Sequence, residues 1–299
     1  MSKQRKILII GHGEMGQAMV HLLGARHSLS VWERRPKGGH VPPDLDVAAA
    51  VAEAIIFCVP APAHGELAAR IAPRLAASTR CISIAKGVDD QGRCAWQIFH
   101  DVLPANSHCG VLYGPMISEE IRAGKPAFAD VGTSGDEDFQ FLHELFAGSA
   151  LYLRPCADPL GLSWCAVLKN VYAILFGIAD ALALGDNLRG YLAVAAVDEI
   201  AAISQCLGGR PETAVRLAGL GDLITTATSA GSHHHALGGL LVQGARDRIR
   251  GEGIHTLDTV HTRRLFDSTP YPLFSLIAQA VRDPREIRRQ VERYLQTLG

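Results

Sequence analysis

An excess of charge of either sign is missing from this sequence. Lys and Arg total 29 and Asp and Glu total 30, so the 299-residue chain has a net charge of −1 at pH 7. A surface without a strong positive field has no general attraction for phosphate backbones or anionic lipid. We therefore expect a small-molecule partner and no nucleic acid.

Closely spaced cysteine pairs and a secretion signal are also missing. The seven cysteines are odd in number, scattered and without a CxxC pair, which is typical of reduced core thiols rather than of disulfides or a zinc site. After the basic opening MSKQRK only four apolar residues follow, too few for the core of a signal peptide. We expect a cytoplasmic protein without a metal site.

No long apolar run is free of polar residues. The longest apolar stretch, Trp164 to Gly185, is interrupted by Lys169, Asn170 and Asp180, each of which is costly at membrane depth. The stretch therefore predicts a buried helix rather than a membrane span, and we expect no membrane partner.

What the sequence has in quantity is apolar residues, 48% of the chain, in two different patterns. Through about residue 155, short β-branched runs alternate with segments of helical periodicity, such as 64–76 and 137–148. The runs predict strands at 6–10, 28–33, 54–59, 81–85, 109–113, 126–131 and 150–153. Alternating strands and helices indicate an α/β fold, a doubly wound and mostly parallel (Rossmann) sheet.

After residue 155 the β-branched runs stop, and alanine and leucine recur at helical spacing. This half is predicted to be an all-helical domain. Asp158 and Pro159 lie in the segment 156–161, the best candidate hinge. We expect a dinucleotide-binding domain at 1–157 and a helical substrate and catalytic domain at 158–299.

A glycine pattern follows the first predicted strand. Gly11, Gly13 and Gly16 form GxGxxG between that strand and a helix-like segment, and Glu33 ends the next strand. In this context the glycines permit a tight turn, close approach of backbone to a pyrophosphate, and helix packing on the strand. The alternative is that they merely close a turn.

The residues after the second strand leave the choice of cofactor open. A carboxylate such as Glu33 binds an unphosphorylated ribose, whereas Arg34 and Arg35 could bind a 2′-phosphate or form a solvated surface pair. We expect NAD or NADP, with a slight preference for NAD because the carboxylate would repel the phosphate.

Two lysines stand out. Lys169 is the only lysine after residue 125, and its apolar neighbours would lower the pKa of its ammonium toward the range of proton exchange. Lys86 follows a predicted strand at the edge where doubly wound sheets bind ligands, so it could hold substrate or oxyanion charge. The alternatives are a snorkelling or ion-paired lysine and a surface lysine.

These pieces, in this order, resemble the soluble NAD(P)-dependent glycerol-3-phosphate dehydrogenases, which interconvert dihydroxyacetone phosphate and sn-glycerol 3-phosphate. The likeness extends over most of the chain through GHGEMG, FCVPA, SIAKGVD, GPMISEEI, VLKNVYAILFGIADALALGDN, LAGLGDLITTATS and GEG. The resemblance implies that Lys169 is the proton donor and acceptor, that Lys86 polarises the substrate oxygen, and that Asp222 fixes the Lys169 ammonium. It also implies a homodimer.

The resemblance further implies two sets of binding residues. For the substrate they are Lys86, Gly114, Asn170, Asp222, Thr226, Ser232, His233 and His234. For the cofactor they are Gly11, Gly13, Glu14, Met15, Gly16, Glu33, Arg34, Lys86, Ser118, His233 and Glu252.

The chain departs from the family's pattern at two places. Ten residues beyond the GD aspartate the family has Ser-Arg-Asn, whose arginine binds the substrate phosphate, but this chain has Ser232 followed by His233, His234 and His235. A neutral histidine lacks the charged fork of arginine, so His233 would bind a different group, or phosphate only when protonated. Met116 is apolar where a small polar side chain is usual.

Three other hypotheses remain. The same lysine-assisted hydride chemistry could act on a different small hydroxy or keto substrate. The chain could be a catalytically silent NAD(P)-binding protein, against which the retention of Lys86, Lys169, Asn170 and Asp222 argues. The adjacent histidines could hold a metal, although consecutive residues do not converge on one ion in regular structure.

Overall fold

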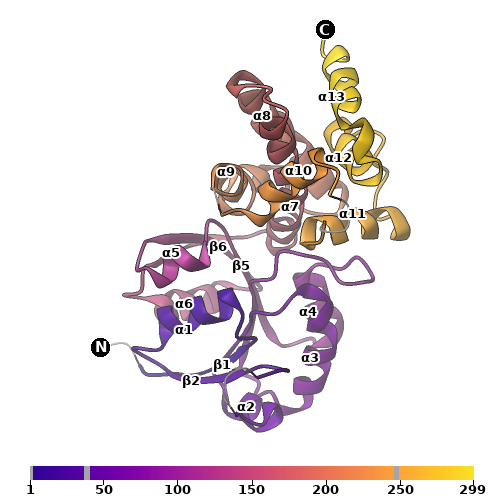
Figure 1. Cartoon of the computed structure of the whole chain (residues 1–299). Coiled ribbons are helices and arrows are strands. Elements are labelled where there is room, and N and C mark those ends of the chain that lie inside the picture. The colour runs from indigo at the N-terminus through magenta and orange to yellow at the C-terminus, as the bar shows by residue number, and fades with distance from the viewer. Residues whose placement is uncertain (1–2, 37–40, 230, 246–248) are drawn as a thin grey trace. The chain divides into compact units, whose positions relative to one another are not determined.

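The computed structural model describes residues 3–36, 41–229, 231–245 and 249–299. Two compact units divide the chain (Figure 1): the first contains the described residues up to Asp89 together with Arg93–Ser163, and the second contains Asp90–Gly92 and Trp164–Gly299. Helix α7 (Pro159–Ala181) crosses this division without a break. The domain limits 1–157 and 158–299 stay a prediction.

The first unit is built on a seven-stranded sheet with the order β2-β1-β3-β4-β5-β6-β7. Neighbouring strands are parallel except β5 and β6, which are antiparallel. The strands are β1 (Lys6–Ile10), β2 (Ser28–Trp32), β3 (Ala54–Phe57), β4 (Arg80–Ser83), β5 (His108–Tyr113), β6 (Ala127–Thr133) and β7 (Leu151–Cys156). All seven predicted strands and the α/β class are confirmed.

Helices cover both faces of this sheet (Figure 1). Ile7 and Ile9 of β1 pack in one core cluster with α1, α5 and α6, whereas Leu8 and Ile10 pack in the other with α2, α3 and α4. Because strand side chains alternate between faces, a strand covered on both sides is apolar throughout, as KILII is. The helices are α1 (Glu14–Leu23), α2 (Leu45–Val51), α3 (His64–Ile71), α4 (Ala95–Val102), α5 (Ser118–Arg122) and α6 (Asp136–Phe146).

Two elements end at positions other than the predicted ones near a proline. The predicted helix at 64–76 stops as α3 at Ile71 and continues only as a 3-10 turn containing Pro73, since proline does not continue the i to i−4 ladder. Strand β7 runs past its predicted end through Pro155. It lies at the edge of the sheet, where the missing N–H of a proline is tolerated.

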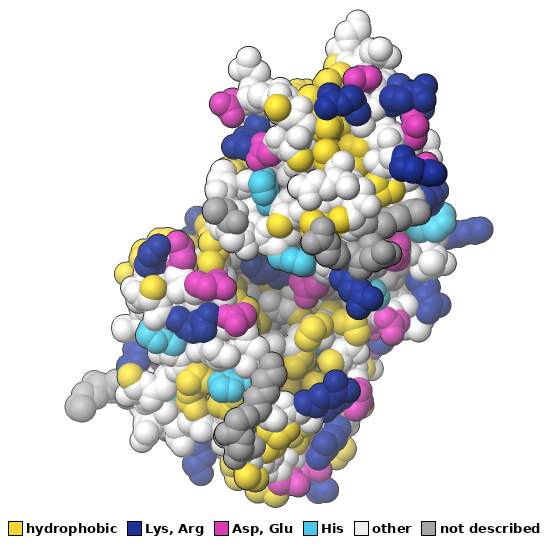
Figure 2. Space-filling model, in the orientation of Figure 1, with side chains coloured by type: hydrophobic (Ala, Val, Ile, Leu, Met, Phe, Trp, Pro, Cys, Tyr) yellow, Lys and Arg dark blue, Asp and Glu magenta, His cyan; other side chains and the backbone are white. Residues whose placement is uncertain are grey.

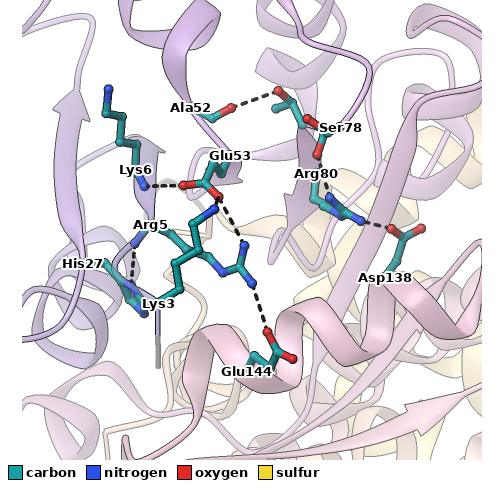
Figure 3. Close-up of polar contacts among 11 residues, drawn as sticks. Lys3, Arg5, Lys6, His27, Ala52, Glu53, Ser78, Arg80, Asp138 and Glu144 are labelled. Atoms are coloured by element: carbon teal, nitrogen blue, oxygen red, sulfur yellow. Dashed lines mark hydrogen bonds and ion pairs between the residues drawn. The ribbon is translucent and has the colours of Figure 1, made fainter. Parts of the chain in front are cut away.

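Ion pairs join the amino ends of the strands (Figure 3). Arg5 contacts Glu53 at 3.2 Å and Glu144 at 3.0 Å, and Arg80 contacts Asp138 at 3.2 Å. Both guanidinium groups also lie over the Phe141 ring, at 4.2 and 4.4 Å from its centroid. This polar network belongs to the edge of the sheet opposite the glycine loop.

Among the described residues, every regular element of the second unit is a helix. They are α7, α8 (Asp186–Cys206), α9 (Asp222–Thr228), α10 (His233–Val242), α11 (Glu252–Arg263), α12 (Pro272–Arg282) and α13 (Ile287–Gln296). Helix α7 is long and apolar enough to cross a membrane, but its apolar window is wholly buried inside the protein. A core helix has these properties, as the sequence predicted.

A buried carboxylate connects three of these helices. Glu199 of α8 accepts hydrogen bonds from the Tyr172 hydroxyl of α7 at 2.6 Å and from the N–H groups of Leu273 and Phe274 at the start of α12, at 2.7 and 2.9 Å. Burial raises the pKa of this carboxyl, while the three hydrogen bonds oppose the rise. The polar contacts fix the register of α7, which carries Lys169.

The surface shows no separation of charge on the face drawn in Figure 2. Lys and Arg side chains are interspersed with Asp and Glu side chains over that face, in agreement with the net charge of −1.

Candidate functional site

The glycine loop follows β1, and at this strand the order of successive strands in the sheet reverses. Strand β1 pairs with β2 on one side and β3 on the other, and crevices at the carboxyl ends of such strands are the usual ligand sites of doubly wound sheets. Gly11 follows β1 with φ of 103°, and its N–H donates to Trp32 O at 2.7 Å. A Cβ on Gly11 would lie 2.8 Å from Cys58 O.

The loop also brings α1 against β1. A Cβ on Gly16 would lie 2.0 Å from Gly11 O, so only glycine permits this approach. Gly13 is the N-cap of α1, and no side chain caps the helix. A Cβ on Gly13 would meet nothing within 4 Å. Open space beside an uncapped helix N-terminus fits a pyrophosphate, so these residues fit NAD or NADP.

The side chains of the two residues after Gly13 are engaged elsewhere. Glu14 pairs with Arg122 of α5, which also donates to Gln17 at 2.9 Å. Met15 packs against the core cluster under α1. Their predicted role in cofactor binding therefore falls to their backbone N–H groups.

The residues predicted to contact the ribose follow β2. Glu33 is half-buried, and Arg34 and Arg35 are exposed. Arg34 pairs with Glu66 of α3 at 2.7 Å, with both side chains largely exposed, and exposed pairs of this kind contribute little to stability. A carboxylate and a guanidinium are thus both available next to this strand end.

Lys86 lies beyond the end of β4. Its Nζ donates to Gly114 O, just past β5, at 3.0 Å. Gly114 itself is packed so closely on β6 that a Cβ would lie 2.4 Å from Phe128 O. Ser118 is buried at the start of α5 and donates to Glu119 at 3.0 Å. The roles of these three residues stay predictions.

A histidine that the sequence did not single out lies under the Lys86 loop. His64 Nδ1 donates to Pro60 O at 3.2 Å, and His64 Nε2 accepts from the Ser83 hydroxyl at 2.8 Å. Ser83 Oγ in turn accepts from the Ala85 N–H at 3.1 Å. Burial favours the neutral imidazole, and this chain of hydrogen bonds links the ends of β3 and β4.

Stability should depend on pH through His64. Burial lowers the pKa of His64 from 6.5 to about 4, so the unfolded state binds the proton more tightly between these values. The stabilising contribution is complete above the ordinary pKa and falls by about 3 kcal/mol as the pH drops toward the folded-state value. Urea unfolding over this range should show a smaller pH slope for His64→Gln than for the parent chain. Equal slopes would contradict the assignment.

In the helical unit, three predicted residues meet. Lys169 Nζ of α7 lies 3.0 Å from Asp222 Oδ2 and donates to Thr226 Oγ1 at 2.7 Å. The Thr226 hydroxyl donates to Asp222 O at 2.7 Å, one turn back along α9. Lys169 and Asp222 are 5% and 3% exposed, which makes this a buried ion pair rather than a snorkelling lysine.

Two more predicted residues lie beside this pair. Asn170 is buried, and its Nδ2 donates to Glu252 Oε2 at the start of α11, at 3.4 Å. A Cβ on Gly253 would lie 2.7 Å from Asn170 O, so the GEG segment holds α11 close to α7. Residues of α9 thus contact the amine of Lys169, and the start of α11 packs on α7 at the next residue, Asn170.

The Ser-His-His-His segment forms a helix start. Ser232 caps α10 by accepting from the His235 N–H at 3.2 Å. His233 Nε2 lies 2.7 Å from Arg250 O, and His235 Nε2 lies 2.7 Å from Asp180 Oδ2. His234 packs beside Gly253. The three imidazoles take different partners, and no group of three or more metal-ligating side chains occurs among the described residues.

Two other features lie apart from these residues. Met116 is buried in the core cluster between the sheet and α1, where an apolar side chain packs well. A cavity of about 820 Å³ lies along α11 and α12, and none of the predicted site residues lines it. Size alone does not indicate a site.

Known proteins that are similar to this chain match both of its halves. The profile for the NAD-dependent glycerol-3-phosphate dehydrogenase N-terminus matches residues 36–138, and that for the C-terminus matches residues 158–292. The chain is 31% identical to a glycerol-3-phosphate dehydrogenase [NAD(P)+] of Acaryochloris marina, over 89% of this chain and 87% of that protein. A second relative, from Salinibacter ruber, is 26% identical over 97% of this chain and 94% of that protein.

Among solved structures, the glycerol-3-phosphate dehydrogenase of Coxiella burnetii has the same fold. It superposes with a TM-score of 0.83 at 23% identity, covering 96% of this chain and 98% of the other. Together with the sequence matches to both halves, this establishes that the chain belongs to the NAD(P)-dependent glycerol-3-phosphate dehydrogenase family.

Proposed function

We propose that this protein is an NAD(P)-dependent dehydrogenase that interconverts dihydroxyacetone phosphate and sn-glycerol 3-phosphate. The observation that carries the proposal is the buried amine of Lys169, held by Asp222 and Thr226. Family membership supplies the reaction, and this amine supplies the one group that carbonyl reduction needs from the protein, a proton donor.

The acid-base step follows from the contacts of Lys169. Its buried amine lies 3.0 Å from the Asp222 carboxylate, which stabilises the ammonium against the cost of burial. Lys169 gives its Nζ proton to the carbonyl oxygen during reduction and takes a proton from the hydroxyl during oxidation. Asn170, beside it, binds a substrate hydroxyl, and Lys86 polarises the substrate oxygen.

The glycine loop of the first unit holds the cofactor. Backbone N–H groups of Glu14, Met15 and Gly16, at the uncapped start of α1, bind the pyrophosphate, and Glu33 binds the ribose. When bound, NAD or NADP supplies the hydride.

We further propose a cytoplasmic homodimer. All seven cysteines are free thiols, as is usual in a reducing compartment. The dimer is an expectation from the family, and light scattering of the purified protein would test it. The proposal includes no nucleic-acid or membrane partner.

The stereochemistry of oxidation tests the proposed function. With NAD⁺ or NADP⁺, the purified protein should convert sn-glycerol 3-phosphate to dihydroxyacetone phosphate and leave the mirror-image sn-glycerol 1-phosphate unchanged. Product identification by NMR provides the measurement. Oxidation of an unphosphorylated hydroxy acid in place of either ester would instead support a different substrate.

A further inference from the structure

A substrate phosphate needs a cation, and two candidate groups of the helical unit, Lys169 and His233, are engaged by other residues. Lys169 is paired with Asp222. His233 is bonded through Nε2 to the carbonyl oxygen of Arg250, at 2.7 Å. We propose that Arg250 binds the phosphate of the substrate and that His233 is a positioning residue, which fixes the main chain from which Arg250 projects. This inference rests on the proposed function and names its anion-binding residue.

The contact with Arg250 decides what His233 can do. A carbonyl oxygen only accepts, so His233 Nε2 must carry the proton of this hydrogen bond. In the neutral imidazole the remaining nitrogen, Nδ1, is then an acceptor and has no N–H for a phosphate oxygen. A neutral His233 is therefore suited to holding a carbonyl and poorly suited to binding an anion.

The same contact locates Arg250 beside the site. Arg250 precedes Glu252 by two residues, a separation of at most about 7 Å along the chain. Glu252 contacts Asn170, the neighbour of Lys169, at 3.4 Å. Gly251 lies against the His233 ring, where a Cβ would be 3.1 Å from Nε2. The main chain at Arg250 is thus held between the starts of α10 and α11.

The charge of Arg250 is available. Its side chain is exposed, and within the described part of the chain no carboxylate forms an ion pair with its guanidinium. Glu252, two residues further along the chain, contacts Asn170. A guanidinium presents a planar fork of donors that matches phosphate, which histidine does not. The positive ends of α10 and α11 add to the attraction for an anion.

Substitution of Arg250 tests the inference. Arg250→Gln should raise KM for dihydroxyacetone phosphate roughly 10- to 100-fold, the usual effect of losing a charge-assisted hydrogen bond. It should leave the KM for unphosphorylated dihydroxyacetone and the Kd for NADH unchanged. Arg250→Lys should give an intermediate value because the charge remains without the fork. Arg288→Gln, an exposed arginine on α13, is the matched control for the lost charge.

A double-mutant cycle tests the positioning role. His233→Ala should also raise KM for the phosphate ester, His233→Gln should restore it through its amide donor, and the Ala variant should add little to Arg250→Gln. Binding of sn-glycerol 3-phosphate, measured by calorimetry, distinguishes a failure of the proposed function from a failure of the Arg250 assignment. If the parent chain neither binds nor oxidises this ester, the proposed function fails. If it does both and Arg250→Gln behaves like Arg288→Gln, the assignment of Arg250 is wrong.

Discussion

Replacing Lys169 by alanine should reduce kcat by roughly 10²- to 10⁴-fold, the usual contribution of a positioned acid-base group. The amine is 5% exposed and lies 3.0 Å from Asp222, and an alanine side chain has no group that can donate a proton in its place. Steady-state rates with dihydroxyacetone phosphate measure the loss. The Kd for NADH should stay unchanged, because the proposed pyrophosphate contacts are backbone N–H groups at the start of α1 and not side chains of α7.

A structural effect of the same substitution must be separated from the chemical one. Lys169→Ala removes the ion-pair partner that lies 3.0 Å from the buried Asp222 carboxylate, and loss of one partner of a buried pair typically costs about 3–5 kcal/mol. Combining it with Asp222→Asn should restore much of the stability and none of the turnover. Recovery of turnover in the double variant would mean that Lys169 serves only to neutralise Asp222.

Alanine at Gly16 should lower the stability of the fold, whereas alanine at Gly13 should change stability little. Gly16→Ala inserts a Cβ 2.0 Å from Gly11 O, so α1 must move away from β1, at a cost of roughly 1–3 kcal/mol in the free energy of unfolding. Gly13→Ala meets open space, and its φ of −71° suits any residue, so it should change stability by less than about 1 kcal/mol.

Gly13→Ala should instead weaken the binding of the cofactor. The methyl group of Gly13→Ala occupies the space beside the first turn of α1, so the Kd for NADH should rise at least about tenfold while the fold is intact. Titration of NADH followed by fluorescence, together with urea unfolding, measures both quantities. Unchanged affinity in Gly13→Ala would exclude the loop as the pyrophosphate site.

Local patterns predicted the features that depend on nearby residues. KILII followed by GxGxxG specifies a strand, a turn and a helix within eighteen residues, and the structure has them in that order. The long apolar stretch around Lys169 forms α7, as its composition indicates. Such patterns are readable because burial and helix packing impose a period on the chain.

Contacts between distant residues were not predictable in the same way. His64 and Ser83 are nineteen residues apart and meet only because β3 and β4 are neighbours in the sheet. His233 contacts the carbonyl oxygen of Arg250, seventeen residues further along the chain. Because of this contact we infer that Arg250, rather than His233, takes the role of the arginine that the family has at position 233. Arg250 stands next to the GEG segment, so its position was visible in the sequence although its contact was not.

The most direct test of the account is the oxidation of NADH and of NADPH by the purified protein in the presence of dihydroxyacetone phosphate, with dihydroxyacetone as the comparison. The account predicts turnover of the phosphate ester with formation of glycerol 3-phosphate, and a much lower kcat/KM for the unphosphorylated ketone. Binding of NADH without its oxidation by the ester, or equal kcat/KM for both ketones, would contradict it.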